Sequence, residues 1–198
     1  MSENCIVSDK VDLHTLSIKQ NKFIRRSAKM RLFISIDLSD EMKNEIIATM
    51  HEMKAAGVKG AYVPKQNLHL TLAFIGETSD AATVKEALSG ISIKPFRLSF
   101  SDLGSFGDLV YIGMKGNQGL SAAVKNVRDA LDRFGIKYDS KKFVPHITII
   151  RKAAGAYRNV KAPSGEMMVK KISLMKSEEK AGKRIYTEIF SAANPKTG

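Results

Sequence analysis

The chain has 198 residues and a formal net charge of +12, with 43% hydrophobic and 26% charged residues. These values are typical of a globular protein with one sizeable core, and no run of about 18 consecutive apolar residues suggests a membrane span. The basic excess favours a polyanionic partner such as nucleic acid. A solvated lysine-rich surface would explain the charge equally well.

The only cysteine is Cys5. A single cysteine forms no internal disulfide and no cysteine-rich zinc site, and it fits a reducing compartment. The first residues also lack the apolar core of a secretory signal. We therefore expect a cytoplasmic protein, and we expect a monomer.

Residues 1–29 differ from the rest of the chain, because they show no clear hydrophobic period and end in the basic run Arg25-Arg26-Ser27-Ala28-Lys29. Met30 then opens a clean strand pattern. We interpret residues 1–29 as an N-terminal extension, which is either a flexible arm or a start-site artefact, and residues 30–198 as one domain.

The first half of the domain alternates strand and helix patterns. Its predicted elements are a strand over 31–38, a helix from Ser39-Asp40 up to Gly57, an extended segment from Val63-Pro64, a strand over 69–75 that stops at Gly76, and a helix from Ser79-Asp80 through Leu88.

The second half adds hairpin-like strand pairs around a third helix. Its predicted elements are strands near 96–100 and 109–114, a helix from about 120 to 134, a strand over 144–150, and two strands near 168–175 and 185–190 joined by a polar turn around 178–182. Mixed strands and helices of this kind indicate an α+β fold, and spacing alone does not fix its topology.

A short motif occurs twice, as His69-Leu70-Thr71-Leu72 and as His146-Ile147-Thr148-Ile149. Residues two apart on a strand point to the same face, so each His shares a face with its Thr while the apolar neighbours are buried. Two such copies among only four histidines are expected by chance in about 1% of such chains. The alternative is two unrelated strands, each with an exposed His and a Thr favoured by β-propensity.

Two His/Thr pairs that face one cleft are suited to phosphodiester chemistry. A neutral imidazole takes a proton from a nucleophile, and an imidazolium gives a proton to a leaving oxygen. Threonine hydroxyls can hold the non-bridging phosphate oxygens. We expect no cofactor, and no metal site because both motifs lack the carboxylates or thiolates that usually complete a zinc site.

These motifs and their flanks resemble the two-histidine (2H) phosphoesterase superfamily. Within it they are most similar to the RNA 2′,3′-cyclic phosphodiesterases, also called LigT-like proteins or 2′-5′ RNA ligases. The resemblance covers about residues 30–192, and the segments that carry it are 30–38, 67–77 (NLHLTLAFIGE) and 143–151.

The resemblance implies a bilobal, pseudo-two-fold α+β fold, with two antiparallel sheets and outer helices around a central cleft. It implies that His69 is the general acid, that His146 is the general base, and that Thr71 and Thr148 hold the phosphate. The implied reaction converts RNA 2′,3′-cyclic phosphate ends, those of tRNA fragments among the candidates, to 2′-phosphomonoesters. The same groups can run a reversible 2′-5′ ligation.

The resemblance also implies that Phe74 and Arg151 bind the substrate. Each lies five residues after its motif histidine, an odd offset that points away from the histidine face unless the strand ends, twists or bulges. The alternatives are a core role for Phe74 and a surface cation for Arg151. At the level of function, the alternatives are a non-catalytic module that binds nucleotides or RNA ends, and a phosphodiesterase for another cyclic or 2′-5′-linked nucleotide.

Overall fold

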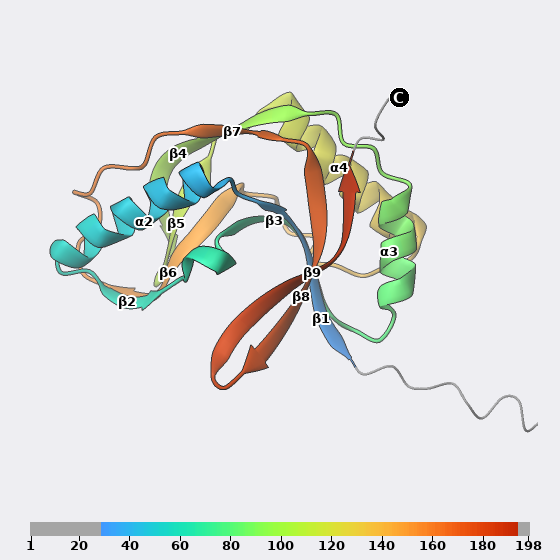
Figure 1. Cartoon of the computed structure of the whole chain (residues 1–198), viewed down its shortest axis with the longest axis horizontal. Coiled ribbons are helices and arrows are strands. Elements are labelled where there is room, and N and C mark those ends of the chain that lie inside the picture. The colour runs from blue at the N-terminus through green and yellow to red at the C-terminus, as the bar shows by residue number, and fades with distance from the viewer. Residues whose placement is uncertain (1–28, 194–198) are drawn as a thin grey trace, which may run out of the picture.

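The computed structural model describes residues 29–193. Of the predicted N-terminal extension, residues 1–28 lie outside the described residues. The described part folds into two antiparallel sheets and three α-helices (Figure 1). The predicted α+β class is therefore confirmed.

The first sheet has four strands in the order β3-β1-β8-β9. Their bounds are Met30–Asp37 for β1, His69–Thr78 for β3, Lys171–Lys180 for β8 and Lys183–Ala193 for β9.

The second sheet has five strands in the order β2-β6-β5-β4-β7. Their bounds are Lys59–Tyr62 for β2, Phe96–Phe106 for β4, Leu109–Met114 for β5, His146–Ala154 for β6 and Glu166–Val169 for β7. Every described strand pair in both sheets is antiparallel.

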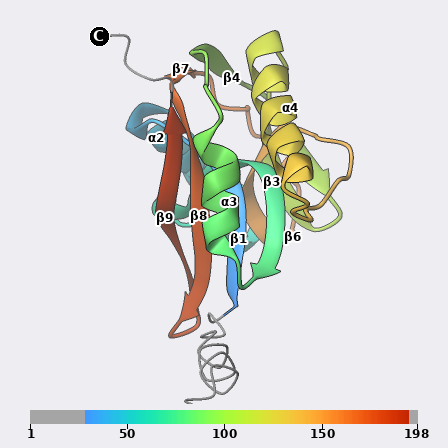
Figure 2. The same ribbon diagram turned by 90° about the vertical axis from the view of Figure 1, so that its right-hand side faces the viewer.

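Each α-helix begins at a side-chain cap that supplies an acceptor for an unpaired backbone N–H. The helices are α2 (Asp40–Ala55), α3 (Ala81–Ser89) and α4 (Gln118–Arg133), and their caps are Ser39, Asp80 and Asn117. In Figure 1, α2 lies beside the five-stranded sheet and α3 lies beside the four-stranded sheet. Helices α3 and α4 contact each other, and α4 also contacts β3 and β4, one strand of each sheet (Figure 2).

One hydrophobic core serves both sheets. Its buried members come from β1, β3, β6 and α4 alike, for example Ile34, Leu70, Ile147 and Val127, each fully buried. Because the two sheets share this core, the strands that carry the two motifs are held rigidly relative to each other.

The structure differs from the sequence predictions mainly where strands end. Strand β3 runs through Gly76 to Thr78 rather than stopping there, because Gly76 adopts a positive φ of 82° and still pairs with Leu32. Strand β6 likewise extends to Ala154 rather than ending at residue 150.

One predicted strand is two strands in the structure, and one observed strand was not predicted. The strand predicted near 168–175 is two strands, because the chain crosses at Lys170 from β7 in one sheet to β8 in the other. Strand β2 was not predicted, because its sequence Lys-Gly-Ala-Tyr has no hydrophobic alternation and is largely exposed.

Candidate active site

The two motif strands come from different sheets and meet. Strand β3 is an edge strand of the four-stranded sheet, and β6 lies inside the five-stranded sheet. Residues of β3 contact residues of β6 (Figures 1 and 2). The charges of His146 and Arg151 both act on His69. The structure therefore brings the three side chains into one electrostatic neighbourhood.

Within each motif, the predicted alternation is confirmed. Leu70 and Ile147 are fully buried, whereas His69 and His146 are half-buried on the opposite face of their strands. The apolar residues thus anchor each strand in the core while each His and its Thr face outward together.

A β-bulge in β3 explains how Phe74 reaches the histidine face. Opposite β3, Ser35 pairs with Thr71 and the next residue, Ile34, pairs with Ala73, which leaves Leu72 as an extra residue. Leu72 and Ala73 are consequently both buried, and Phe74, half-exposed, returns to the face of His69.

Strand β6 has a bulge at the same place in its motif. Tyr111 pairs with Thr148 and the next residue, Val110, pairs with Ile150, so that Ile149 is the extra residue. Both isoleucines are fully buried, and the following Arg151 is exposed. The matched bulges explain the odd offset of five residues in both copies and argue against a core role for Phe74.

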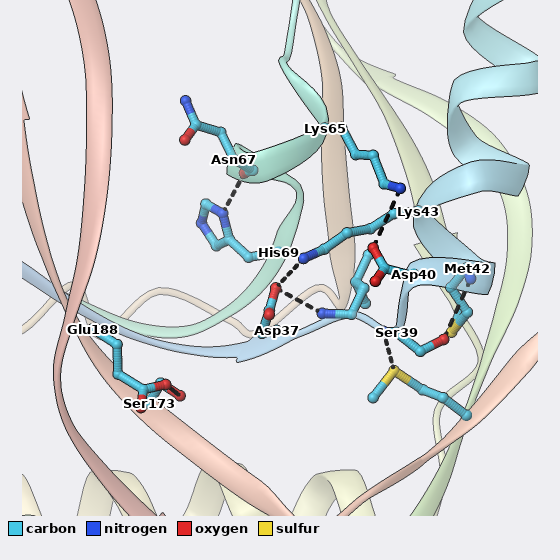
Figure 3. Close-up of polar contacts among 12 residues, drawn as sticks. Asp37, Ser39, Asp40, Met42, Lys43, Lys65, Asn67, His69, Ser173 and Glu188 are labelled. Carbon is cyan, nitrogen blue, oxygen red and sulfur yellow. Dashed lines mark hydrogen bonds and ion pairs between the residues drawn. The ribbon is translucent and has the colours of Figure 1, made fainter.

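Both histidines are oriented by the same backbone contact. Nδ1 of His69 lies 2.7 Å from the carbonyl oxygen of Asn67 (Figure 3), and Nδ1 of His146 lies 2.7 Å from that of Val144. Because a carbonyl oxygen only accepts, each Nδ1 carries the hydrogen and donates it. This fixes Nε2 as the nitrogen that exchanges protons with a ligand.

The two threonines differ in their contacts. Oγ of Thr71 lies 3.1 Å from Nε2 of His69, so the hydroxyl donates to the ring when His69 is neutral. Among the described residues, Thr148 has no such bond with His146. Thr148 pairs with Tyr111 across β6 and β5.

Each histidine ring contacts a phenylalanine and a tyrosine, which also contact each other. The centroid of the His69 ring is 4.8 Å from that of Phe33 and 5.2 Å from that of Tyr186. The His146 ring is 5.1 Å from Phe106 and 5.3 Å from Tyr111. No sequence motif marks these four residues, because they lie on four other strands and only the fold brings them to the motifs.

Burial is the main cause that lowers the pKa of His69 from its ordinary value, and the positive charge of Arg151 and the charge of His146 lower it further. The bond to the Asn67 carbonyl and the charge of Asp37 act in the opposite direction. Asp37 pairs with His69 across β1 and β3, and its carboxylate lies 2.7 Å from the ammonium of Lys43 (Figure 3). The free protein therefore favours a neutral His69 at neutral pH.

The two residues predicted to bind the substrate, Phe74 and Arg151, both lie on the histidine face of their strands. The guanidinium carbon of Arg31 lies 4.9 Å from the centroid of the Phe74 ring, a cation–π contact at the edge of the sheet. Arg151 is exposed and lies close enough to His69 to affect its charge state.

Other candidate features lie elsewhere. His51 is exposed on α2, and His14 lies outside the described residues. Between residues 29 and 193, no three His, Cys, Asp or Glu side chains form a group that could hold a metal ion. No helix in the same range is long and apolar enough to cross a membrane.

Two imidazoles that can exchange protons at Nε2, two hydroxyls and one guanidinium on contacting strands of an α+β fold are the arrangement of a two-histidine phosphoesterase. The model of the 2′-5′ RNA ligase superfamily matches residues 41–181. The chain belongs to this superfamily.

Curated relatives include an RNA 2′,3′-cyclic phosphodiesterase of Archaeoglobus fulgidus, 32% identical over 75% of this chain and 91% of the relative. A protein of the same name from Escherichia coli is 36% identical over 66% of this chain and 76% of the relative. Among solved structures, E. coli LigT complexed with 3′-AMP superposes with a TM-score of 0.73 at 30% identity, over 85% of this chain and 99% of LigT.

Proposed function

We propose that this chain hydrolyses 2′,3′-cyclic phosphate ends of RNA to 2′-phosphomonoesters, with His69 as general acid and His146 as general base. Its curated relatives share the name RNA 2′,3′-cyclic phosphodiesterase. The observation that carries the mechanism is that two His/Thr strands from separate sheets meet, each with Nδ1 held by a carbonyl and Nε2 directed away from it.

In the proposed reaction, water attacks the phosphorus from the side of His146. Nε2 of His146 takes the proton of the water, the new P–O bond forms, and the bond from phosphorus to the ribose 3′ oxygen breaks. Nε2–H of His69 gives its proton to that leaving oxygen. The product keeps the phosphate on the 2′ oxygen, and the two histidines exchange protonation states.

The neighbouring groups have electrostatic roles. The hydroxyls of Thr71 and Thr148 donate to the non-bridging oxygens, whose charge grows in the transition state. Arg151 neutralises the phosphate, and the ring of Phe74 stacks on the base of the terminal nucleotide. LigT complexes with phosphate and with 3′-AMP support phosphate and nucleotide binding at this fold.

The lowered pKa of His69 fits a general acid that becomes protonated only when the anionic substrate binds. The free protein holds His69 mostly neutral, and an anionic phosphate at Nε2 favours the imidazolium. The negative charge of the bound phosphate therefore favours the protonated form of His69, which acts as the acid.

RNA is the substrate class that the relatives' names and the net charge of +12 support. tRNA fragments with cyclic ends are one candidate. A cytoplasmic site of action fits the single cysteine. A monomer would suffice, because one chain carries both motifs of the site.

A second candidate activity is 2′-5′ ligation, which the description of the superfamily favours. It uses the same acid and base, with an RNA 5′-hydroxyl in place of water.

The test uses an oligoribonucleotide that ends in a 2′,3′-cyclic phosphate, incubated with the protein in EDTA. We expect a 2′-phosphate end from the wild type, and losses of about 10²–10⁴-fold in kcat/KM for His69→Ala and His146→Ala. His51→Ala, an exposed histidine on α2, is the matched control and should keep full activity. A 3′-phosphate product would reverse the leaving-group assignment, and full activity in either motif variant would refute the mechanism.

A further inference from the structure

The aromatic neighbours of the two histidines differ in exposure. Phe33 beside His69 is 3% exposed, whereas Phe106 beside His146 is 46% exposed. The ring of Phe106 stacks on Tyr111 with centroids 4.5 Å apart and stands edge-on to His146 at 82°. With one face on Tyr111, this ring leaves much of its surface open next to the proposed general base.

The Phe106 platform is held in place by the backbone around it. Phe106 ends β4 and pairs with Leu109 across a tight hairpin. The carbonyl of Asp108 in that hairpin accepts a 2.8 Å hydrogen bond from the N–H of Ala153 in β6. The open ring is therefore tied to the strand that carries His146, and it needs little ordering before it binds a ligand.

A cavity of about 510 Å³ is lined by Gly104 and Ser105, the two residues that precede Phe106 in β4. The missing side chain of Gly104 leaves room for the Tyr111 ring, because a Cβ there would overlap the ring atoms. Tyr157 and Arg158 line the same cavity. Its size is in the range of small-ligand sites, and an aromatic ring with a guanidinium suits a nucleotide.

The chemistry assigns this side of the site to the nucleophile. In an in-line displacement, the attacking and leaving oxygens lie on opposite sides of the phosphorus. The ribose that carries the cyclic phosphate stays attached to the leaving 3′ oxygen, so it lies towards His69 and Phe74. Water needs no aromatic surface, and a base stacked beside His146 therefore belongs to a nucleophile that is itself a nucleoside.

We infer that Phe106, with the adjoining cavity, is the subsite for the nucleoside whose 5′-hydroxyl attacks the cyclic phosphate in 2′-5′ ligation. This inference rests on the proposed function, in which His146 is the base. The 5′ oxygen bonds to phosphorus and gives its proton to Nε2 of His146. The bond from phosphorus to the 3′ oxygen breaks, and His69 protonates that oxygen, so that a 2′-5′ diester forms with no further reactant.

The test measures ligated and hydrolysed products from the same mixture of cyclic-phosphate RNA and a 5′-hydroxyl oligoribonucleotide. We expect Phe106→Ala to lower the ratio of ligated to hydrolysed product by about tenfold, as loss of a base–aromatic stack does. Phe106→Tyr should restore the ratio. Phe134→Ala, which truncates a phenylalanine of 39% exposure at the end of α4, is the matched control and should leave the ratio unchanged.

Three results would overturn the inference while leaving the proposed function intact. In the first, the wild-type protein hydrolyses the cyclic phosphate but forms no ligated product with excess 5′-hydroxyl strand. In the second, Phe106→Ala lowers the yields of both products in parallel. In the third, Phe106→Ala lowers hydrolysis of a dinucleotide cyclic phosphate but not of a mononucleotide cyclic phosphate. The last would place the upstream base of the donor strand on Phe106. A wild-type protein that neither hydrolyses nor ligates would refute the proposed function and this subsite together.

Discussion

The two copies of one motif share a backbone and differ in their surroundings. In both, a carbonyl two residues earlier holds Nδ1, and a bulge three residues after the histidine turns the fifth residue to the same face. Around His69, however, Phe33 is buried and Thr71 bonds the ring, while Phe106 beside His146 is open. Local geometry therefore supplies two equivalent proton carriers, and the residues around them give them different tasks.

Removal of the hydroxyls of Thr71 and Thr148 tests whether the two motifs contribute equally to phosphate binding. We expect Thr71→Val and Thr148→Val each to lower kcat/KM by about 10²-fold, because each removes one donor to the phosphate oxygens at constant volume. Steady-state hydrolysis of a cyclic-phosphate end measures this. The Ser variants should recover most of the loss, since they keep the hydroxyl. A variant with unchanged kcat/KM would remove that threonine from the phosphate site.

A methyl group at Gly104 should disturb the packing around His146 and leave the packing around His69 unchanged. Gly104→Ala forces the Tyr111 ring to move, since the new Cβ would overlap it. We expect a loss of about 1–3 kcal/mol in the free energy of unfolding, the usual cost of overpacking, measured by urea denaturation. Gly90→Ala is the control, because no atom lies within 4 Å of its added Cβ, and it should be neutral or slightly stabilising. Equal stability in the two variants would contradict the packing described around Tyr111.

Removal of Arg151 should change the pH dependence through His69. The positive charge of Arg151 lowers the pKa of His69, so Arg151→Ala raises it. If His69 acts as the acid, activity requires its protonated form, and the alkaline limb of kcat/KM against pH moves to higher pH. Arg151→Lys keeps the charge and should leave the limb in place. A shift of the acid limb instead would make His69 the base.

The sequence predicted the elements that depend on local pattern. The buried strand before Ser39, the three α-helices and the motif strands are all present, because hydrophobic period and capping residues determine them locally. It also placed each motif His and Thr on one strand face. The threonines' roles in phosphate binding stay a prediction.

The parts that sequence did not predict depend on register between distant strands. The sequence contains no signal for the β-bulges at Leu72 and Ile149. Without those bulges, Phe74 and Arg151 would face away from the motif histidines. The aromatic neighbours of the histidines are likewise set by pairing with strands far away in the chain, as Tyr186 illustrates.

A double-variant comparison tests whether His69 and His146 act as one acid–base pair on a single phosphate. We would measure kcat/KM for hydrolysis of a 2′,3′-cyclic phosphate end by His69→Ala, His146→Ala and the double variant. Groups that act as a unit are strongly non-additive, so the double variant should be about as slow as either single variant. Losses that multiply in the double variant would show that the two histidines contribute independently and do not act as one pair.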